Sequence, residues 1–169
     1  MTKETQHQIF GEWLTNHKGI FFKVARAYAF TPMDQDDLFQ EISLQVWNSV
    51  PSFRGEAAVG TWLYRIALNT AIKWSSKAKK QVTAAALETV QHLLQENRMA
   101  VNDRLQWLYQ EISRLNSIDR SLTLLLLDDF SYKEMADILG ISLSNVGVKI
   151  NRIKKLLISK SKKYVDHGI

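Results

Sequence analysis

Residues that interrupt helices are scarce in this chain, and their scarcity limits the folds open to it. The 169 residues include two prolines, Pro32 and Pro51, and seven glycines, and neither type occurs between Gly60 and Gly140. Proline and glycine are the strongest local breaks in regular structure. Apolar residues recur along most of the chain at the three- and four-residue spacing of an amphipathic helix. The sequence therefore predicts an all-α fold.

Three helices are predicted in the first part of the chain. The first carries apolar residues at helical spacing: Ile9, Phe10, Trp13, Leu14, Phe21, Val24 and Tyr28. Thr31 is the predicted N-cap of the second helix, with Pro32 at its first helical position and Asp34 in its first turn. The predicted buried stripe of this helix is Leu38, Phe39, Ile42, Val46 and Trp47. After the break "SVPSFRGEA", a third helix is predicted over about 58–76, with Val59, Trp62, Leu63, Ile66 and Ile72 inward.

A second group of helices is predicted in the last part of the chain. Leu105, Leu108, Ile112 and Leu115 open it, and the apolar stretch "IDRSLTLLLLDDF" is predicted to form its central helix. Between the two groups, residues 83–99 are rich in alanine and only modestly amphipathic, which favours a linker with helical tendency. We therefore predict two small helical domains, at residues 5–80 and 103–165, joined by a linker at residues 81–102.

Composition argues against several classes of protein. Cysteine is absent, which excludes disulfides and thiolate metal sites and fits a reducing cytoplasm, and the four histidines are scattered. No apolar run approaches the roughly 20 residues that span a bilayer, and the start "MTKETQHQIF" lacks the form of a signal peptide. Phosphate-binding loops, dinucleotide-binding glycine motifs and nucleophile elbows are missing. We expect a cytoplasmic protein that is not an enzyme, with no catalytic residues, no metal, no cofactor, no small-molecule substrate and no membrane insertion.

Charge is distributed unevenly along the chain. The formal net charge is +5 and the pI is near 9.4, which suggests a polyanionic partner. Residues 149–163 contain seven lysines and arginines and no acid, whereas the stretch "DQDDLFQE" at 34–41 contains four acids and no base. The C-terminal region therefore suits phosphates, and residues 34–41 suit a basic protein surface.

The stretch "SYKEMADILGISLSNVGVKINRIKKLL" at 131–157 has the pattern of a helix-turn-helix. Ser131 and Glu134 form a predicted capping box at the start of the first helix. Gly140 is predicted to end that helix in the left-handed conformation, and Ser142 to cap the next one. Two helices around such a short turn, with the small residue Ala136 where they cross, are typical of a unit whose second helix reads DNA.

The second of these helices divides into a buried and an outward side. Its inward residues are predicted to be Val146, Ile150, Ile153 and Leu157, and the residues predicted to face DNA are Ser144, Asn145, Gly147, Val148, Lys149, Asn151, Arg152 and Lys155. Arginine and lysine can bond phosphate or a guanine edge, and asparagine can pair with adenine. A helical hairpin that merely packs, with its lysines as a solvated surface, is the alternative interpretation of the same residues.

Both halves of the chain together resemble the bacterial sigma factors of the extracytoplasmic-function group, within the sigma-70 family. The segment "DQDDLFQEISLQVWNSVPSFRGEAAVGTWLYRIALNTAIKW" is similar to region 2 of that family. The segment "LNSIDRSLTLLLLDDFSYKEMADILGISLSNVGVKINRIKKLL" is similar to region 4. The resemblance implies a cytoplasmic bacterial protein that binds core RNA polymerase and directs initiation at particular promoters.

The resemblance implies a polymerase-binding role for the acidic helix. In this family that helix docks on the clamp helices of the β′ subunit, and the matching positions are Asp34, Asp37, Leu38, Gln40 and Glu41. Acids beside an apolar residue suit a basic, partly apolar partner. An ordinary solvated acidic first turn, favoured by the helix dipole, is the alternative interpretation.

The resemblance also implies that the loop after this helix, and the helix that follows, melt the −10 promoter element. Within these segments the candidate residues are Phe53, Arg54, Trp62, Tyr64, Arg65, Asn69 and Lys73. Capturing a base from opened DNA needs aromatic faces for stacking and cations along the displaced strand. Tyr64, Arg65 and Asn69 are expected to face outward, and Trp62 is expected to support them from the core.

Region 4 of the family implies contacts with the −35 element through the second helix of the helix-turn-helix, and with the polymerase β flap through an apolar surface. The chain departs from the family at Gly147, where relatives often carry lysine or arginine. Lys149, Asn151 and Arg152 are therefore expected to carry more of the sequence readout. An anti-sigma protein is a further implied partner. A stand-alone helix-turn-helix regulator that does not dock on core polymerase is the alternative function.

Overall fold

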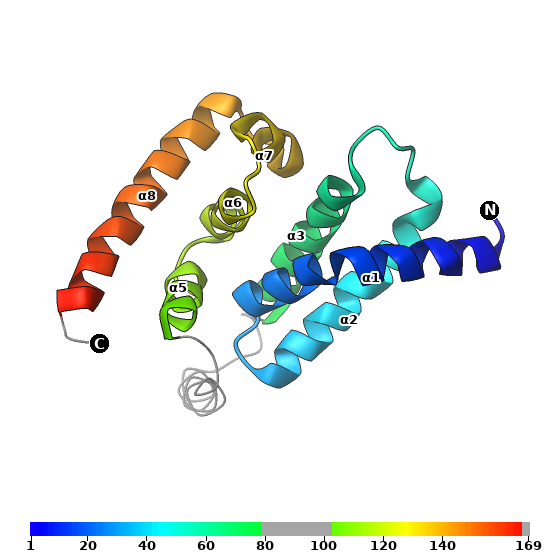
Figure 1. Ribbon diagram of the computed structural model, residues 1–169, viewed down its shortest axis with the longest axis horizontal. Coiled ribbons are helices and arrows are strands. Elements are labelled where there is room, and N and C mark those ends of the chain that lie inside the picture. Colours follow the sequence, from blue (N-terminus) through cyan, green and yellow to red (C-terminus); the bar gives the residue numbers. More distant parts are fainter. Residues whose placement is uncertain (79–102, 167–169) are drawn as a thin grey trace. The chain divides into compact units, whose positions relative to one another are not determined.

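The computed structural model describes residues 1–78 and 103–166. All regular elements in these two ranges are helices, as predicted (Figure 1). The chain divides into two compact units, Met1–Tyr109 and Gln110–Ile169. The linker predicted at 81–102, with its helical tendency, lies outside the described residues. None of the described helices is both long enough and apolar enough to cross a membrane.

Three helices of the first unit pack against one another: α1 (Lys3–Tyr28), α2 (Pro32–Ser49) and α3 (Val59–Ala78). A single 3-10 turn, η1 (Val50–Ser52), follows α2 and contacts α1. The largest fully buried side chains of this bundle are Phe21, Tyr28, Leu38, Ile42, Leu63, Tyr64 and Leu68. Burial of such side chains removes apolar surface from water and is the main force that holds the three helices together.

The start of α2 follows the predicted chemistry. The Thr31 side chain accepts a hydrogen bond from the Asp34 backbone N–H at 3.0 Å, and Pro32 occupies the first helical position. Leu38, Ile42 and Val46 are buried as predicted, whereas Phe39 and Trp47 are partly exposed. The buried stripe of α2 is thus narrower than the sequence pattern indicated.

The second unit contains α6 (Ser117–Leu127), α7 (Tyr132–Leu139) and α8 (Leu143–Asp166), while α5 (Asp103–Ser113) crosses the boundary between the units. The predicted central helix is α6, which contacts both α7 and α8. The core of the second unit consists of buried side chains from these three helices: Leu122, Leu124, Leu125, Met135, Ile138, Val146, Ile150 and Ile153. The Arg120 guanidinium donates to the carbonyl oxygens of Ser113 and Leu115, at 2.9 Å each, and so ties α6 to the end of α5.

Candidate nucleic-acid interface

The turn between α7 and α8 has the predicted helix-turn-helix geometry. Ser131 and Glu134 form a complete capping box, because the Ser131 N–H donates to Glu134 Oε2 at 2.7 Å and the Glu134 N–H donates to Ser131 Oγ at 3.1 Å. Gly140 has a φ of +66° and ends α7. Ser142 Oγ accepts from the Asn145 N–H at 3.1 Å and caps α8. Both caps and the left-handed glycine are therefore confirmed.

One side of α8 is buried and another is open. Val146, Ile150 and Ile153 are buried as predicted. The predicted DNA-facing residues with exposed side chains are Ser144, Asn145, Val148, Asn151, Arg152 and Lys155. Gly147 and Lys149 are only partly exposed and lie at the edge of this surface. Polar and basic groups on the open side can reach phosphates or base edges in a groove.

A carboxylate on α6, which the sequence pattern did not single out, contacts the basic residues of α8. Asp119 Oδ1 lies 3.3 Å from Lys149 Nζ, and Asp119 Oδ2 lies 3.9 Å from Arg152 Nη2. The Lys149 side chain is 21% exposed, whereas that of Arg152 is 64% exposed. Asp119 stands thirty positions before Lys149, so no local motif could have connected them.

The candidate −10 residues on α3 do not all lie on one surface. Arg65, Asn69 and Lys73 are exposed and follow one another at four-residue spacing, which places them on one face of the helix. Tyr64 is only 1% exposed, so the prediction that it faces outward is wrong. The three-helix bundle buries a wide face of α3, which includes Leu63, Tyr64 and Leu68. Tyr64 therefore cannot stack on a base in this arrangement.

The loop before α3 is held by an aromatic cluster. The Phe53 ring lies 5.1 Å from the ring of Trp13 and 5.7 Å from that of Trp62, measured between centroids. Edge-to-face and tilted pairs at such separations are favourable. The Trp62 indole Nε1 is buried and has no hydrogen-bond partner among the described residues. Trp62 thus packs against Phe53 at the base of the loop, which also contains the exposed Arg54.

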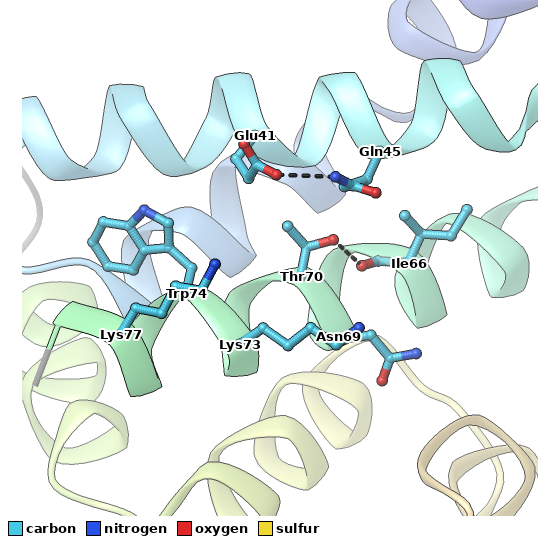
Figure 2. Close-up of a pocket in the computed structure, with 8 residues that line it drawn as sticks. All are labelled: Glu41, Gln45, Ile66, Asn69, Thr70, Lys73, Trp74 and Lys77. Atoms are coloured by element: carbon cyan, nitrogen blue, oxygen red, sulfur yellow. Dashed lines mark hydrogen bonds between the residues drawn. The ribbon is translucent and has the colours of Figure 1, made fainter. Parts of the chain in front are cut away.

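A cleft of about 470 Å³ lies between α2 and α3 (Figure 2). Its lining consists of Glu41, Gln45, Ile66, Asn69, Thr70, Lys73, Trp74 and Lys77. Figure 2 shows the Trp74 ring standing between the two helices. Glu41 Oε1 accepts a hydrogen bond from Gln45 Nε2 at 3.0 Å, and Thr70 Oγ1 donates to the Ile66 carbonyl at 2.7 Å. The cleft therefore adds the Trp74 indole face and the Lys77 cation beside the exposed Asn69 and Lys73.

The outward face of α2 is acidic with apolar residues at both ends. Asp37 and Gln40 are exposed as the polymerase-binding prediction requires, and Asp34 and Glu41 are partly exposed. Leu38 is fully buried, so it cannot contact a partner directly. The exposed apolar groups are instead Met33 at 74% and Leu44 at 51%. Together these residues define the α2 surface: Met33, Asp37, Gln40 and Leu44, spaced by four, three and four positions on one helix face.

Comparisons with known proteins identify the family. The family model for sigma-70 region 2 matches residues 13–81, and that for sigma-70 region 4 matches residues 105–157. RNA polymerase sigma factor YlaC of Bacillus subtilis is 33% identical over 126 residues, which cover 70% of this chain and 72% of that protein. This chain belongs to the extracytoplasmic-function sigma factors of the sigma-70 family. The sigma-E factor of Escherichia coli K12 is 29% identical to this sigma factor over 142 residues, or 75% and 73% of the two chains.

Two solved structures share the fold of this sigma factor. CnrH in complex with the cytosolic domain of CnrY has a TM-score of 0.63 and 21% identity, with 96% of this chain and 91% of that chain covered. The sigma factor RpoE of Bartonella quintana, in complex with the anti-sigma factor NepR, has a TM-score of 0.68 and 19% identity, with 92% and 98% covered. At these identities the likeness establishes the fold.

Proposed function

We propose that this sigma factor binds core RNA polymerase and directs promoter-specific initiation by recognising −10 and −35 elements and melting DNA. The observation that carries this proposal is the presence, in one chain, of a capped helix-turn-helix and of a separate acidic and apolar helix face on α2. A stand-alone regulator would need only the first. We assign polymerase docking and −10 recognition to residues 5–80, −35 recognition to residues 103–165, and the link between them to residues 81–102.

The α2 surface is the proposed polymerase-binding site. Asp37 and Gln40 lie between the exposed apolar side chains of Met33 and Leu44. Such a surface suits a basic, partly apolar partner, and we assign that role to the β′ clamp helices, on which the corresponding helix of the family docks. Asp34 and Glu41 flank it with further negative charge, and Leu38 holds the helix on the core. Charge complementarity speeds association and favours the correct partner.

The exposed face of α3 and the loop held by Phe53 are the proposed −10 site. Arg65 and Lys73 can neutralise phosphates of the displaced strand, and the Asn69 amide between them can bond a base edge. Arg54 and the edge of the Phe53–Trp62 cluster lie at the loop, where a base would be received. Stacking contributes roughly 1–3 kcal/mol per base. That is comparable to the few kcal/mol needed to extrude one base.

The exposed side of α8 is the proposed −35 site. Ser144, Asn145, Asn151 and Arg152 supply hydrogen-bonding groups, and Val148 offers an apolar contact for a thymine methyl. Lys155 is placed to bond phosphate, and the absence of a side chain at Gly147 permits close approach to the groove. The apolar surface of the same domain is the proposed site for the β flap.

We further propose that an anti-sigma protein controls this chain by covering these surfaces. Two structures with the same fold are complexes: CnrH with the cytosolic domain of CnrY, and the sigma factor RpoE with the anti-sigma factor NepR. The proposed setting is the bacterial cytoplasm, and all bond-forming chemistry is assigned to the polymerase. The chain itself is proposed to act without catalytic residues, metal or cofactor.

Run-off transcription with core polymerase over a promoter library tests this function. The full chain is mixed with core polymerase, and the transcripts are sequenced to obtain their start sites and upstream motifs. A shared pair of motifs near −10 and −35, absent from reactions with core polymerase alone, is the expected result. Failure to bind core polymerase, together with specific binding of the free chain to DNA, would instead support the stand-alone regulator.

A further inference from the structure

Asp119 is one carboxylate shared by two cations of the −35 helix. Its side chain is 10% exposed, and its two oxygens lie 3.3 Å from Lys149 Nζ and 3.9 Å from Arg152 Nη2. Charges in such a weakly hydrated position interact more strongly than surface charges do. The shorter contact is to Lys149, whose side chain is mostly buried, and the longer one is to Arg152, whose side chain is mostly exposed. The carboxylate therefore holds Lys149 and also contacts Arg152, most of whose side chain stays exposed.

The position of this carboxylate is fixed from its own helix. Asn116 is the N-cap of α6: its Oδ1 accepts from the Asp119 backbone N–H at 2.9 Å, and its Nδ2 donates to Asp119 Oδ2 at 3.0 Å. The same oxygen that faces Arg152 is thus already oriented by Asn116. Because the backbone of Asp119 is fixed in the first turn of α6 and its side chain already accepts a hydrogen bond from Asn116, pairing with α8 costs little further conformational freedom.

Resting on the proposed −35 function, we propose that Asp119 is a positioning residue that sets the specificity of the −35 helix. It keeps the Lys149 ammonium away from the phosphate backbone, where that charge would add affinity for every sequence equally. It also restrains the Arg152 guanidinium on the side facing α6, so that the planar group is presented in one orientation. An oriented arginine can make a bidentate contact with a guanine edge.

Asp119→Asn is the direct test, because asparagine keeps the size of the side chain and an oxygen for Asn116 while removing the charge. Holoenzyme binding is measured on two DNAs, one with the −35 sequence that the library selects and one with that sequence scrambled. The expected result is a preference for the matched −35 that falls by about fivefold or more, the low end of one bidentate base contact. The logarithmic salt slope on scrambled DNA should steepen by about 0.9, as for one added phosphate contact.

Glu111→Gln is the matched control. Glu111 is also a buried carboxylate that holds a lysine of α8, since Lys160 Nζ lies 2.7 Å from its Oε2. This variant frees a lysine far along α8 from the proposed base readers. It should leave the preference between the two DNAs unchanged. An equal loss of preference in both variants would mean that any missing carboxylate weakens the domain, and would overturn the positioning role.

Lys149→Met gives a second, independent readout if Asp119→Asn does not fold, as judged by circular dichroism. Without Lys149, Asp119 pairs with Arg152 alone, so the preference should fall while the salt slope on scrambled DNA stays constant. A slope shallower by about 0.9 would show that Lys149 itself contacts phosphate, and would overturn the inference. An unchanged preference in Asp119→Asn overturns the inference but not the proposed function. A wild-type holoenzyme with no −35 preference overturns both.

Discussion

Among residues 110–166 of the second unit, two adopt the left-handed conformation, and each follows the end of a helix. Gly140 has a φ of +66° after α7, and Asp129 has a φ of +61° just beyond α6. Aspartate is among the few side chains that tolerate this region, since its short polar group can bond locally, whereas glycine enters it freely. The glycine was predictable because it follows an apolar periodic segment. The left-handed backbone of Asp129 was not, because no glycine marks that position in the sequence.

Replacing Gly140 should destabilise the fold through backbone strain alone. A Cβ added at Gly140 would meet no atom within 4 Å, so packing is not the obstacle. We expect Gly140→Ala to lower the free energy of unfolding by about 1–2 kcal/mol, the strain of a left-handed L-residue. Gly147→Ala is the control, because Gly147 lies inside α8 and its position is equally open. That variant should raise stability by up to about 1 kcal/mol. Urea unfolding followed by circular dichroism measures both, and equal signs would contradict this account.

At the level of elements, the surface of α2 differs from its sequence pattern in an informative way. Pattern reasoning placed Leu38 both in the core and at the partner surface, and the bundle buries it fully. The apolar groups available to a partner are Met33 and Leu44, which the predicted buried stripe does not include. Their exposure depends on how α1 and α3 cover α2, which is a tertiary fact that no single helix encodes.

We expect Asp37→Ala and Leu44→Ser each to weaken binding to core polymerase by about fivefold or more, the effect of losing an interface residue that contributes over 1 kcal/mol. The charge and the apolar group are both exposed on α2, so neither change should alter the fold. Fluorescence titration with labelled chain gives the dissociation constants. Glu12→Gln, on the exposed side of α1, removes one acid elsewhere and should have no effect. Binding unchanged in both α2 variants would exclude this helix as the docking site.

The aromatic cluster under the loop allows DNA opening to be tested separately from polymerase binding. Phe53→Leu removes ring contacts with Trp13 and Trp62 while remaining apolar. We expect slower open-complex formation, measured by permanganate reactivity of unpaired thymines, with core polymerase affinity unchanged. Phe22→Leu is the control, since Phe22 is exposed and stacks on Phe39 instead. Equal opening rates for Phe53→Leu and wild type would remove the loop from the melting step.

For the whole molecule, local signals predicted more than long-range ones. Thr31, the Ser131–Glu134 box and Gly140 were correctly assigned because each acts within four residues of itself. The predicted outward orientation of Tyr64 was wrong, because the three-helix bundle buries more of α3 than one apolar stripe suggests. The ion pairs of Asp119 with α8 could not be predicted from the sequence, since a contact between positions thirty or more residues apart produces no periodic pattern. The roles of the proposed polymerase, −10 and −35 surfaces stay predictions, and one transcription assay can test the two DNA-binding surfaces together.

Variants in the two units should act independently in transcription. Arg152 belongs to the proposed −35 site and Asn69 to the proposed −10 site, in separate compact units. Mutations at distant sites without shared partners have additive free energies. We therefore expect the fold-reduction in initiation rate for Arg152→Ala with Asn69→Ala to equal the product of the single reductions. Run-off assays on one promoter measure all four proteins. A double variant no worse than either single one would mean that both residues serve one contact.

Asp119 links the first turn of α6 to the basic residues of α8. The Asp119 backbone N–H donates to the cap residue Asn116, and the Asp119 carboxylate accepts from the Asn116 amide and pairs with cations of α8. Unwinding of that first helical turn would therefore release Lys149 and Arg152 at once. The domain would then still bind DNA through its positive charge, but it would discriminate less between one −35 sequence and another.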